Sequence, residues 1–148
     1  MPRHFVSASA RIDAPATVIY DIVADYHRHH PNILPAAFSN LVVRQGGVGA
    51  GTVITFDLKV MGVTRHYEGF VTEPEPGRYL LESYPAEGGV TSFRVEPDGN
   101  GCTLTIGTEF DVRTGPLGAI ERWMTGKLLG PIYAEELRLL ATYAARQP

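Results

Sequence analysis

The sequence has little of what would commit a chain to a membrane, to nucleic acid or to a disulfide framework. Cys102 is the only cysteine, so no internal disulfide can form, and a reducing compartment is the simpler expectation. No apolar run approaches the roughly 20 residues that a membrane-spanning helix needs. The net charge of -3 gives no general attraction to nucleic acid or to an anionic membrane surface. We therefore expect a cytoplasmic protein with no nucleic-acid partner and no integral membrane association.

The amino terminus also lacks the apolar segment of a secretory signal peptide, because its residues already alternate as they do in a strand. The length of 148 residues fits a single domain over residues 1–148. A chain of this length buries roughly 70% of its unfolded surface, which is enough for a core without disulfides.

A metal site is not expected, although the segment DYHRHHPNILP at residues 25–35 holds three histidines within four positions. A zinc site needs three or four ligands in fixed geometry, and the sequence has no second cluster of His or Cys. We expect no metal and no cofactor. The segment is either a solvated connection after a helix or a gate at the mouth of a ligand-binding cavity. In the second case, His30 would donate a hydrogen bond to a ligand oxygen.

Helical and strand patterns divide the chain into three parts. Residues 5–12 alternate as a half-buried strand, and residues 13–26 have the spacing of a helix with Asp13 as its N-cap and Pro15 in its first turn. Pro31 should stop or interrupt that helix. A last helix is predicted from residue 115 to about Arg146, interrupted at Gly130 and Pro131.

The middle of the chain, from about residue 40 to residue 113, consists of apolar and aromatic runs separated by turns rich in Gly and Pro. Connections this short favour antiparallel hairpins, so we predict about six antiparallel strands in a meander. Alternation turns one residue in two inward, for example Thr91, Phe93, Leu104 and Val112.

These patterns predict an α+β fold. With the first strand, the curved antiparallel sheet has about seven strands, and two short helices follow that strand. The sheet must bury one face, and the long C-terminal helix is the largest apolar element available to cover it. Such a sheet does not close completely around one helix, and the remaining gap is the expected functional site.

Four stretches carry a resemblance to a known family. The segment ARIDAPATVIYDIVADY leads into HPNILP, GGVGAGT lies between two strands, and YEGFVTEPEPGRYLLE follows. In this order they resemble the START-like superfamily with its Bet v 1-type helix-grip fold, and more narrowly its polyketide cyclase/dehydrase and lipid transport (SRPBCC) branch. The resemblance implies a cavity that binds apolar small molecules. Relatives shuttle lipids, sense hormones, or fold or dehydrate polyketide chains.

Two charged residues fall at positions that the patterns turn inward. Arg65 lies on the more apolar face of VTRHYEGFV, and Glu136 lies within the apolar stripe of the last helix. A buried carboxylate is costly unless it is paired, protonated or hydrated. We hypothesise that Glu136 faces the cavity and pairs with Arg65. The alternatives are that Arg65 extends to water at the sheet edge and that Glu136 lies at the rim of the helix.

The glycine-rich segment GGVGAGTV leads into a strand rather than a helix and lacks a following Gly-Lys-Ser/Thr, so it does not fit a phosphate-binding loop. We expect a flexible hairpin that can lift over the cavity entrance. The candidate ligand-binding residues are Tyr26, His30, Phe56, Arg65, Tyr67, Phe93, Thr108, Phe110, Glu136 and Tyr143.

Three functions remain open from the sequence. The first is a carrier or sensor that binds a small hydrophobic molecule, such as a lipid, a polyketide or an aromatic compound. The second is a polyketide cyclase/aromatase or dehydratase that uses polar groups in the same cavity. The third is a protein-interaction module without a small ligand. A homodimer is possible, and no catalytic residue can be assigned.

Overall fold

Seven antiparallel strands form one sheet in the computed structural model, which describes residues 3–111 and 114–147. The strand order is β1-β7-β6-β5-β4-β3-β2, so each strand from β2 to β7 pairs with its neighbour in sequence and β1 closes onto β7. This confirms the predicted meander. The strands are β1 (Arg3–Ile12), β2 (Phe38–Gln45), β3 (Val53–Val60), β4 (Val63–Glu75), β5 (Tyr79–Tyr84), β6 (Gly89–Asp98) and β7 (Gly101–Asp111).

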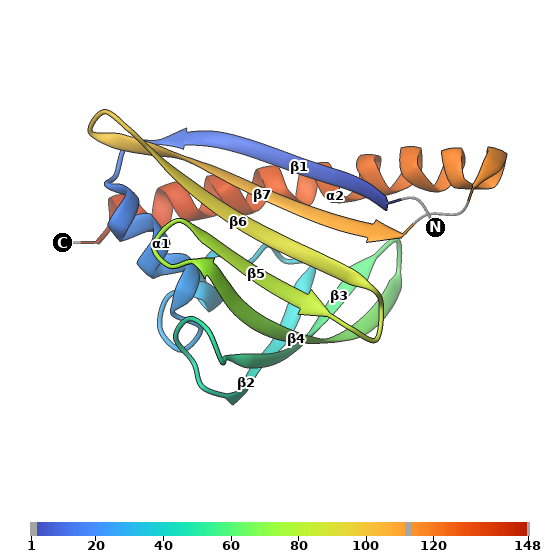
Figure 1. The fold of residues 1–148 in the computed structure, drawn as a ribbon, viewed down its shortest axis with the longest axis horizontal. Helices are drawn as coiled ribbons and strands as arrows, with labels where there is room; N and C mark the ends of the chain where they lie inside the picture. The colour runs from blue at the N-terminus through green and yellow to red at the C-terminus, as the bar shows by residue number, and fades with distance from the viewer. Residues whose placement is uncertain (1–2, 112–113, 148) are drawn as a thin grey trace.

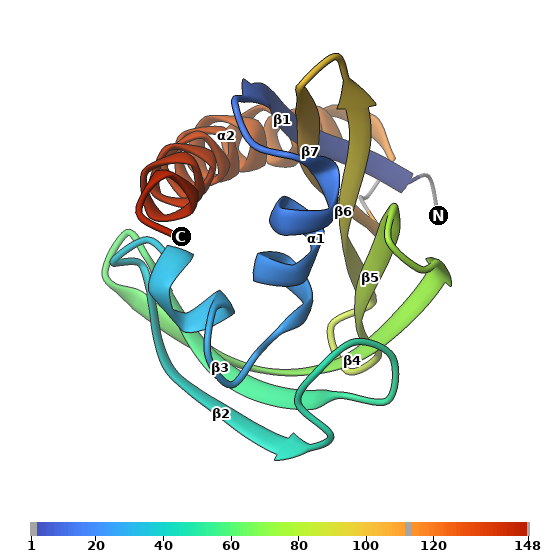
Figure 2. The same cartoon turned by 90° about the vertical axis from the view of Figure 1, so that its left-hand side faces the viewer.

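The sheet curves around the long helix α2 (Gly115–Ala145), as the helix-grip prediction required. Figure 2 shows the strands curving around the short helix α1 (Ala16–Ala24), with α2 on the side that the sheet leaves open. A 3-10 helix, η1 (His30–Ile33), follows α1. The predicted α+β class and the two short helices after the first strand are therefore present.

The concave face of the sheet is the buried one. Phe93 and Val95 of β6 and Leu104 and Ile106 of β7 are inaccessible or nearly so, as the alternation predicted. Val112, predicted to continue this face, lies outside the described residues. The buried face packs on α1 at one end of the sheet, and this packing positions the inward side chains of the site.

Helix α1 begins and ends at different residues from those predicted. Pro15 rather than Asp13 is the N-cap, its carbonyl accepts a hydrogen bond from the Ile19 N–H at 3.2 Å, and the Asp13 carboxylate binds Arg11 instead. The helix ends at Ala24 because Asp25 is extended. Pro31 therefore lies in the first turn of η1, where its missing N–H costs nothing.

Helix α2 continues through Pro131, so the predicted interruption at Gly130 and Pro131 is wrong. Proline removes one backbone hydrogen bond and crowds the preceding turn. The helix is retained because the turns after Pro131 bury Tyr133, Leu137 and Leu140 against the sheet and η1.

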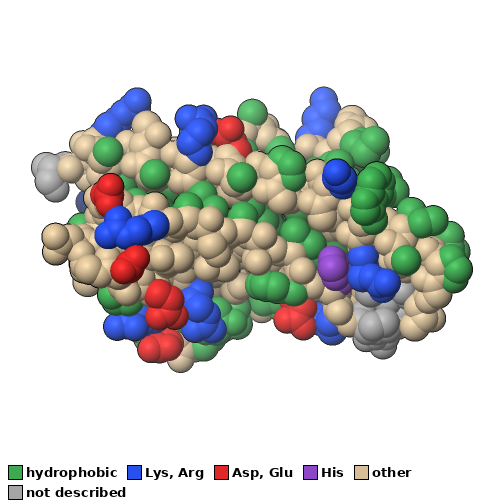
Figure 3. Space-filling model, turned by 90° about the horizontal axis from the view of Figure 1, so that it is seen from above, with side chains coloured by type: hydrophobic (Ala, Val, Ile, Leu, Met, Phe, Trp, Pro, Cys, Tyr) green, Lys and Arg blue, Asp and Glu red, His purple; other side chains and the backbone are tan. Residues whose placement is uncertain are grey.

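The two halves of α2 differ in burial. Before Pro131 the large apolar residues Leu117, Ile120, Trp123 and Met124 are exposed, and Trp123 has 65% of its surface accessible. Figure 1 shows this half extending past the ends of β1 and β7, and Figure 3 shows apolar side chains gathered over it. Neither helix in the described part of the chain combines the length and apolar content needed to cross a bilayer.

Candidate functional site

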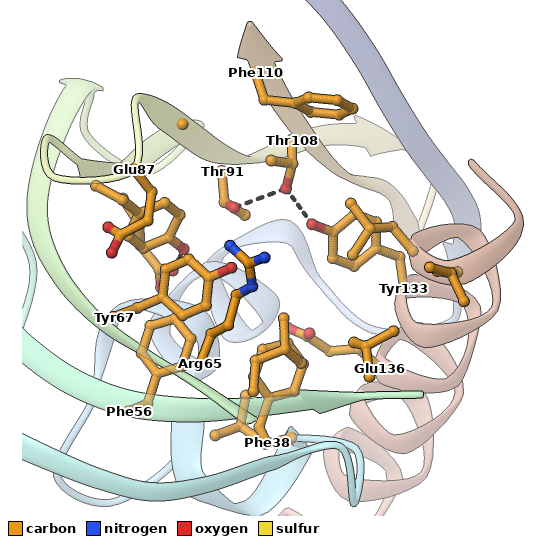
Figure 4. A pocket seen from close by; sticks show the side chains of 18 of the residues that line it. Phe38, Phe56, Arg65, Tyr67, Glu87, Thr91, Thr108, Phe110, Tyr133 and Glu136 are labelled. Carbon is orange, nitrogen blue, oxygen red and sulfur yellow. Dashed lines mark hydrogen bonds between the residues drawn. The ribbon is translucent and has the colours of Figure 1, made fainter. Parts of the chain in front are cut away.

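A cavity of about 540 Å³ lies between the concave face of the sheet and α2. Strands β2 to β7, η1 and α2 all contribute side chains to its lining. Figure 4 shows these side chains converging on the hollow. The lining includes most of the predicted ligand-binding residues, namely His30, Phe56, Arg65, Tyr67, Phe93, Thr108, Phe110 and Glu136.

Two predicted site residues, Tyr26 and Tyr143, lie outside the cavity lining. The Tyr26 side chain is enclosed in the core, and its hydroxyl donates to the carboxylate of Glu82. The Tyr143 hydroxyl lies 2.7 Å from His29 Nδ1. Both are on the buried side of their segments, but that side faces other protein groups at these positions rather than the hollow.

The mouth of the cavity consists of Met61, Val63, Arg65 and Glu87, all of which are exposed. Met61 and Gly62 both have positive φ, at 52° and 79°, and Val60 pairs with Val63. This is the geometry of a type I′ hairpin, and it places the tip of β3 and β4 at the rim. Figure 1 shows this tip at the end of the molecule opposite α1.

The closed end of the cavity consists of His30, Glu82, Phe93 and Glu136, all of them buried. His30 was predicted at the mouth, and the structure places it at this opposite end. The reason is local: α1 ends early, and the turn that follows brings His30 back so that its Nδ1 lies 2.7 Å from the Val23 carbonyl oxygen.

His30 is held by its ring as well as by this hydrogen bond. It stacks on Tyr26 with ring centroids 4.3 Å apart and meets Phe93 edge-on. A carbonyl oxygen can only accept a hydrogen bond, so Nδ1 is protonated and its N–H donates to the Val23 carbonyl oxygen. Burial lowers the pKa of His30, and in the neutral ring Nε2 then has a free lone pair.

Glu82 is a site residue that the sequence did not identify. Its Oε1 accepts a hydrogen bond from the Tyr84 hydroxyl at 2.6 Å, and its Oε2 accepts one from the Tyr26 hydroxyl. His30 Nε2 lies 3.9 Å from the same Oε2, which is beyond hydrogen-bond distance. Two tyrosine hydroxyl donors therefore hold this carboxylate at the closed end of the cavity.

Glu136 is the second carboxylate at the closed end, and only 3% of its surface is accessible. Its Oε2 has no hydrogen-bond partner among the described residues. Burial, and then the nearby charge of Glu82, raise the pKa of Glu136 well above its ordinary value. Both effects favour the protonated form of the Glu136 carboxyl group.

The hypothesised ion pair between Arg65 and Glu136 is not formed. Both side chains project into the hollow (Figure 4), but Arg65 is exposed at the mouth and Glu136 is buried at the closed end. In the described part of the chain, none of the salt bridges within 4.0 Å joins them. Alternation fixes which face of the sheet a residue occupies, whereas an ion pair also requires that the two residues lie at the same distance from the cavity mouth.

A hydrogen-bonded chain crosses the cavity wall from the sheet to α2. The Thr91 and Thr108 hydroxyls lie 2.8 Å apart, and Thr108 also bonds the Tyr133 hydroxyl (Figure 4). Burial raises the pKa of Tyr133 to about 12, so it stays protonated and can donate. The opposite wall is aromatic: Phe56 stacks on Tyr67 with centroids 5.4 Å apart.

The glycine-rich loop was predicted to cover the cavity entrance, but it lies elsewhere. The Gly47 carbonyl accepts from the Tyr26 N–H at 2.7 Å, and the Gly49 N–H donates to the Ala24 carbonyl at 3.0 Å. A Cβ on Gly47 would lie 2.0 Å from the ring of His27, so a larger residue would displace that ring, and the φ of 147° also favours glycine. The loop is fastened to the end of α1, and its residues are not part of the cavity lining.

Metal ligands are also not assembled in this region. Within residues 3–111 and 114–147, no group of three or more His, Cys, Asp or Glu side chains is placed so that it could hold a metal ion.

Comparison with known proteins gives one family and several structures. The family model described as polyketide cyclase / dehydrase and lipid transport matches residues 3–145. No curated protein matches the sequence.

The structures share the fold over nearly their whole length. The KanY protein is 25% identical, with a TM-score of 0.86 over 98% of this chain and 99% of that one. The Zhui aromatase/cyclase from Streptomyces sp. R1128 is 16% identical, with a TM-score of 0.76 over 98% and 95%. A START superfamily protein from Mycobacterium smegmatis is 18% identical, with a TM-score of 0.76 over 97% and 98%.

Proposed function

Because the chain belongs to the polyketide cyclase/dehydrase and lipid transport family, we propose that it binds a small apolar molecule in the cavity, as a carrier or a sensor. The observation that carries this proposal is the cavity itself. Its volume of about 540 Å³ lies within the range of small-molecule sites. Its walls are largely aliphatic and aromatic, and its buried charged groups, Glu82 and Glu136, lie at the closed end.

The energetics favour binding that depends on one or two polar contacts. Burying roughly 300 Å² of apolar ligand surface contributes about 7 kcal/mol. Association costs at least ~4 kcal/mol of this, which leaves an affinity near the millimolar range. One charge-assisted hydrogen bond adds about 1.5–3 kcal/mol and moves the affinity toward micromolar. The polar groups at the closed end therefore decide which apolar molecules bind usefully.

A cavity-filling variant tests this function. Leu58 lines the cavity, so Leu58→Trp should occupy the ligand volume and weaken binding of the uncharged fluorescent probe N-phenyl-1-naphthylamine at least about tenfold. Val42→Trp is the matched control, because Val42 is exposed on β2 and does not line the cavity. Equal binding by both variants, or no binding by the unmodified protein, would count against the proposal. Native mass spectrometry of the purified protein should in addition reveal a co-purified apolar compound.

A second candidate, an enzyme of the polyketide cyclase or dehydratase type, is favoured by one specific observation. Glu136 and the Nε2 atom of His30 are titratable groups that face the same apolar cavity without hydrogen-bond partners among the described residues. A proton donor and a proton acceptor in one largely apolar cavity could move a proton on an enolisable ketone. Incubation with a poly-ketone mimic, followed by chromatography, tests this. Cyclised product that disappears in Glu136→Gln would support the enzyme, and unchanged substrate would leave the carrier or sensor.

A further inference from the structure

The closed end of the cavity has more free hydrogen-bond acceptors than donors. The Glu82 carboxylate already accepts hydrogen bonds from two tyrosine hydroxyls. The Oε2 atom of Glu136 has no partner among the described residues. His30 uses its Nδ1–H on Val23 and presents Nε2 toward Glu82 without bonding it. A ligand group that fits here must bring several donors.

The charges along the cavity lining are also uneven. Among the described lining residues, the carboxylates of the closed end are Glu82 and Glu136, and the only titratable base beside them is His30. Burial holds that imidazole neutral by lowering its pKa. Arg65 lies far toward the exposed mouth, where Glu87 also lines the rim. The inner end therefore favours a cation and repels an anion, and its low-dielectric surroundings strengthen both effects.

We infer that the closed end takes the protonated primary amine of an amphipathic aromatic ligand, with Glu136, Glu82 and His30 Nε2 around the ammonium group. An ammonium group has three N–H donors and one positive charge, which matches three acceptors and a carboxylate that lacks a counterion. The aromatic body would lie between Phe56, Tyr67 and Phe110 nearer the mouth. This inference rests on the proposed function, because it names the ligand class of the same cavity.

Binding of such an amine should release a proton. Burial and the charge of Glu82 favour the protonated form of Glu136, because both raise its pKa. An ammonium group beside it favours the carboxylate, so the Glu136 proton passes to the solvent while the ligand keeps its own. The other titratable groups at this end are His30 from η1, Glu82 and Tyr84 from β5, Tyr133 from α2, and Tyr26, which follows α1. Tyr133 keeps its proton, since its pKa is about 12.

A matched ligand series tests the inference by isothermal titration calorimetry at pH 7. The three probes are 2-(1-naphthyl)ethylamine, 2-(1-naphthyl)ethanol and 1-naphthaleneacetate, which share the aromatic body and differ in the polar group. The amine should bind at least about tenfold more tightly than the alcohol, and the carboxylate should bind most weakly. Titrations in two buffers with different ionisation enthalpies should show the release of about one proton per amine bound.

Two variants locate the effect. Glu136→Gln keeps the shape and removes the charge, so it should abolish both the preference for the amine over the alcohol and the proton release. Glu87→Gln is the matched control, because it removes a carboxylate from the mouth of the same cavity, and it should retain both effects.

Each other outcome overturns the inference. Equal binding of amine and alcohol without proton release would exclude the amine while leaving the proposed function intact. An amine preference that survives in Glu136→Gln would place the cation elsewhere. Failure of all three probes to bind would reject the proposed function as well. If Glu136→Gln does not fold, the ligand series and the proton count on the unmodified protein decide the question.

Discussion

The two ends of the cavity are built in opposite ways. At the closed end, Glu82 and Glu136 are buried among tyrosines and a neutral imidazole. At the mouth, 75% of the Met61 surface is accessible, and the exposed Arg65 projects into the hollow without an ion pair among the described residues. Charges at the closed end are poorly screened, and burial together with the charge of Glu82 raises the pKa of Glu136, whereas a charge at the mouth interacts mainly with water. We therefore expect the closed end to recognise the polar group of a ligand and the mouth to control how the ligand enters.

Helix α2 contributes to both ends, and two of its leucines, Leu140 and Leu117, give the largest expected contrast. Leu140 is 0% exposed and Leu117 is 59% exposed. Leu140→Ala should lower the free energy of unfolding by about 2–5 kcal/mol, because it leaves a void in a packed region. Leu117→Ala should change it by less than about 0.5 kcal/mol. Urea denaturation of the two variants measures both values, and equal losses would mean that the first half of α2 is also packed in solution.

The tyrosine hydroxyls give the next largest effect. Tyr84→Phe removes a donor from the buried Glu82 carboxylate, and a hydrogen bond to a charged group contributes about 1.5–3 kcal/mol. Tyr67→Phe is the matched control, because Tyr67 lines the same cavity but its hydroxyl has no hydrogen-bond partner in the described part of the chain. It should change the free energy of unfolding by no more than about 0.5 kcal/mol. Similar losses in both variants, in the same denaturation assay, would contradict the network at the closed end.

Glu136 should reduce stability at alkaline pH. Its pKa is raised on folding, so the native state binds a proton that the unfolded state releases above about pH 4.3. The stability that this proton contributes is complete below that pH and is lost as the pH rises through the pKa of the folded state. Glu136→Met should therefore be more stable than the unmodified protein at pH 8, by about 1–3 kcal/mol, with a smaller difference at pH 4.

Urea titrations of both proteins from pH 4 to pH 8 measure this difference. His30 contributes with the opposite sign in both, because its lowered pKa makes stability fall as the pH drops below about 6.5. Taking the difference between the two proteins removes that contribution. A difference that does not grow with pH would show that Glu136 is hydrated or paired in solution.

Arg65 should give the smallest effect. Arg65→Met replaces an exposed side chain that makes no ion pair with any described residue, so the free energy of unfolding should change by less than about 0.5 kcal/mol. A dry ion pair with Glu136 would instead lead to a loss of several kcal/mol. Thermal and urea unfolding of this variant distinguish the two arrangements directly.

The fold could be predicted because its signals repeat along the chain. Period-two alternation placed Val63, Arg65 and Tyr67 on one face of β4, and all three line the cavity. The resemblance to the START-like superfamily is confirmed by the family match over residues 3–145. It was detectable because it rests on the order of elements rather than on a few catalytic residues.

The details of the site were harder to predict, for identifiable reasons. The strand of Glu82 has apolar residues on both faces, such as Leu80 and Leu81, so alternation alone did not choose between them. Still, Leu80, Glu82 and Tyr84 share the buried face, and the spacing of Leu80 and Tyr84 was a usable signal. The attachment of the glycine-rich loop to α1 depends on backbone hydrogen bonds, which leave no side-chain pattern in the sequence.

A crystal structure of the protein grown with 2-(1-naphthyl)ethylamine tests the central claim most directly, which is that the hollow between the sheet and α2 is the binding site. We predict the naphthalene ring between the aromatic wall and α2, with the amine nitrogen at hydrogen-bond distance from Glu136. An interior filled by the protein's own side chains, with the ligand absent or bound on the outer surface, would contradict the account.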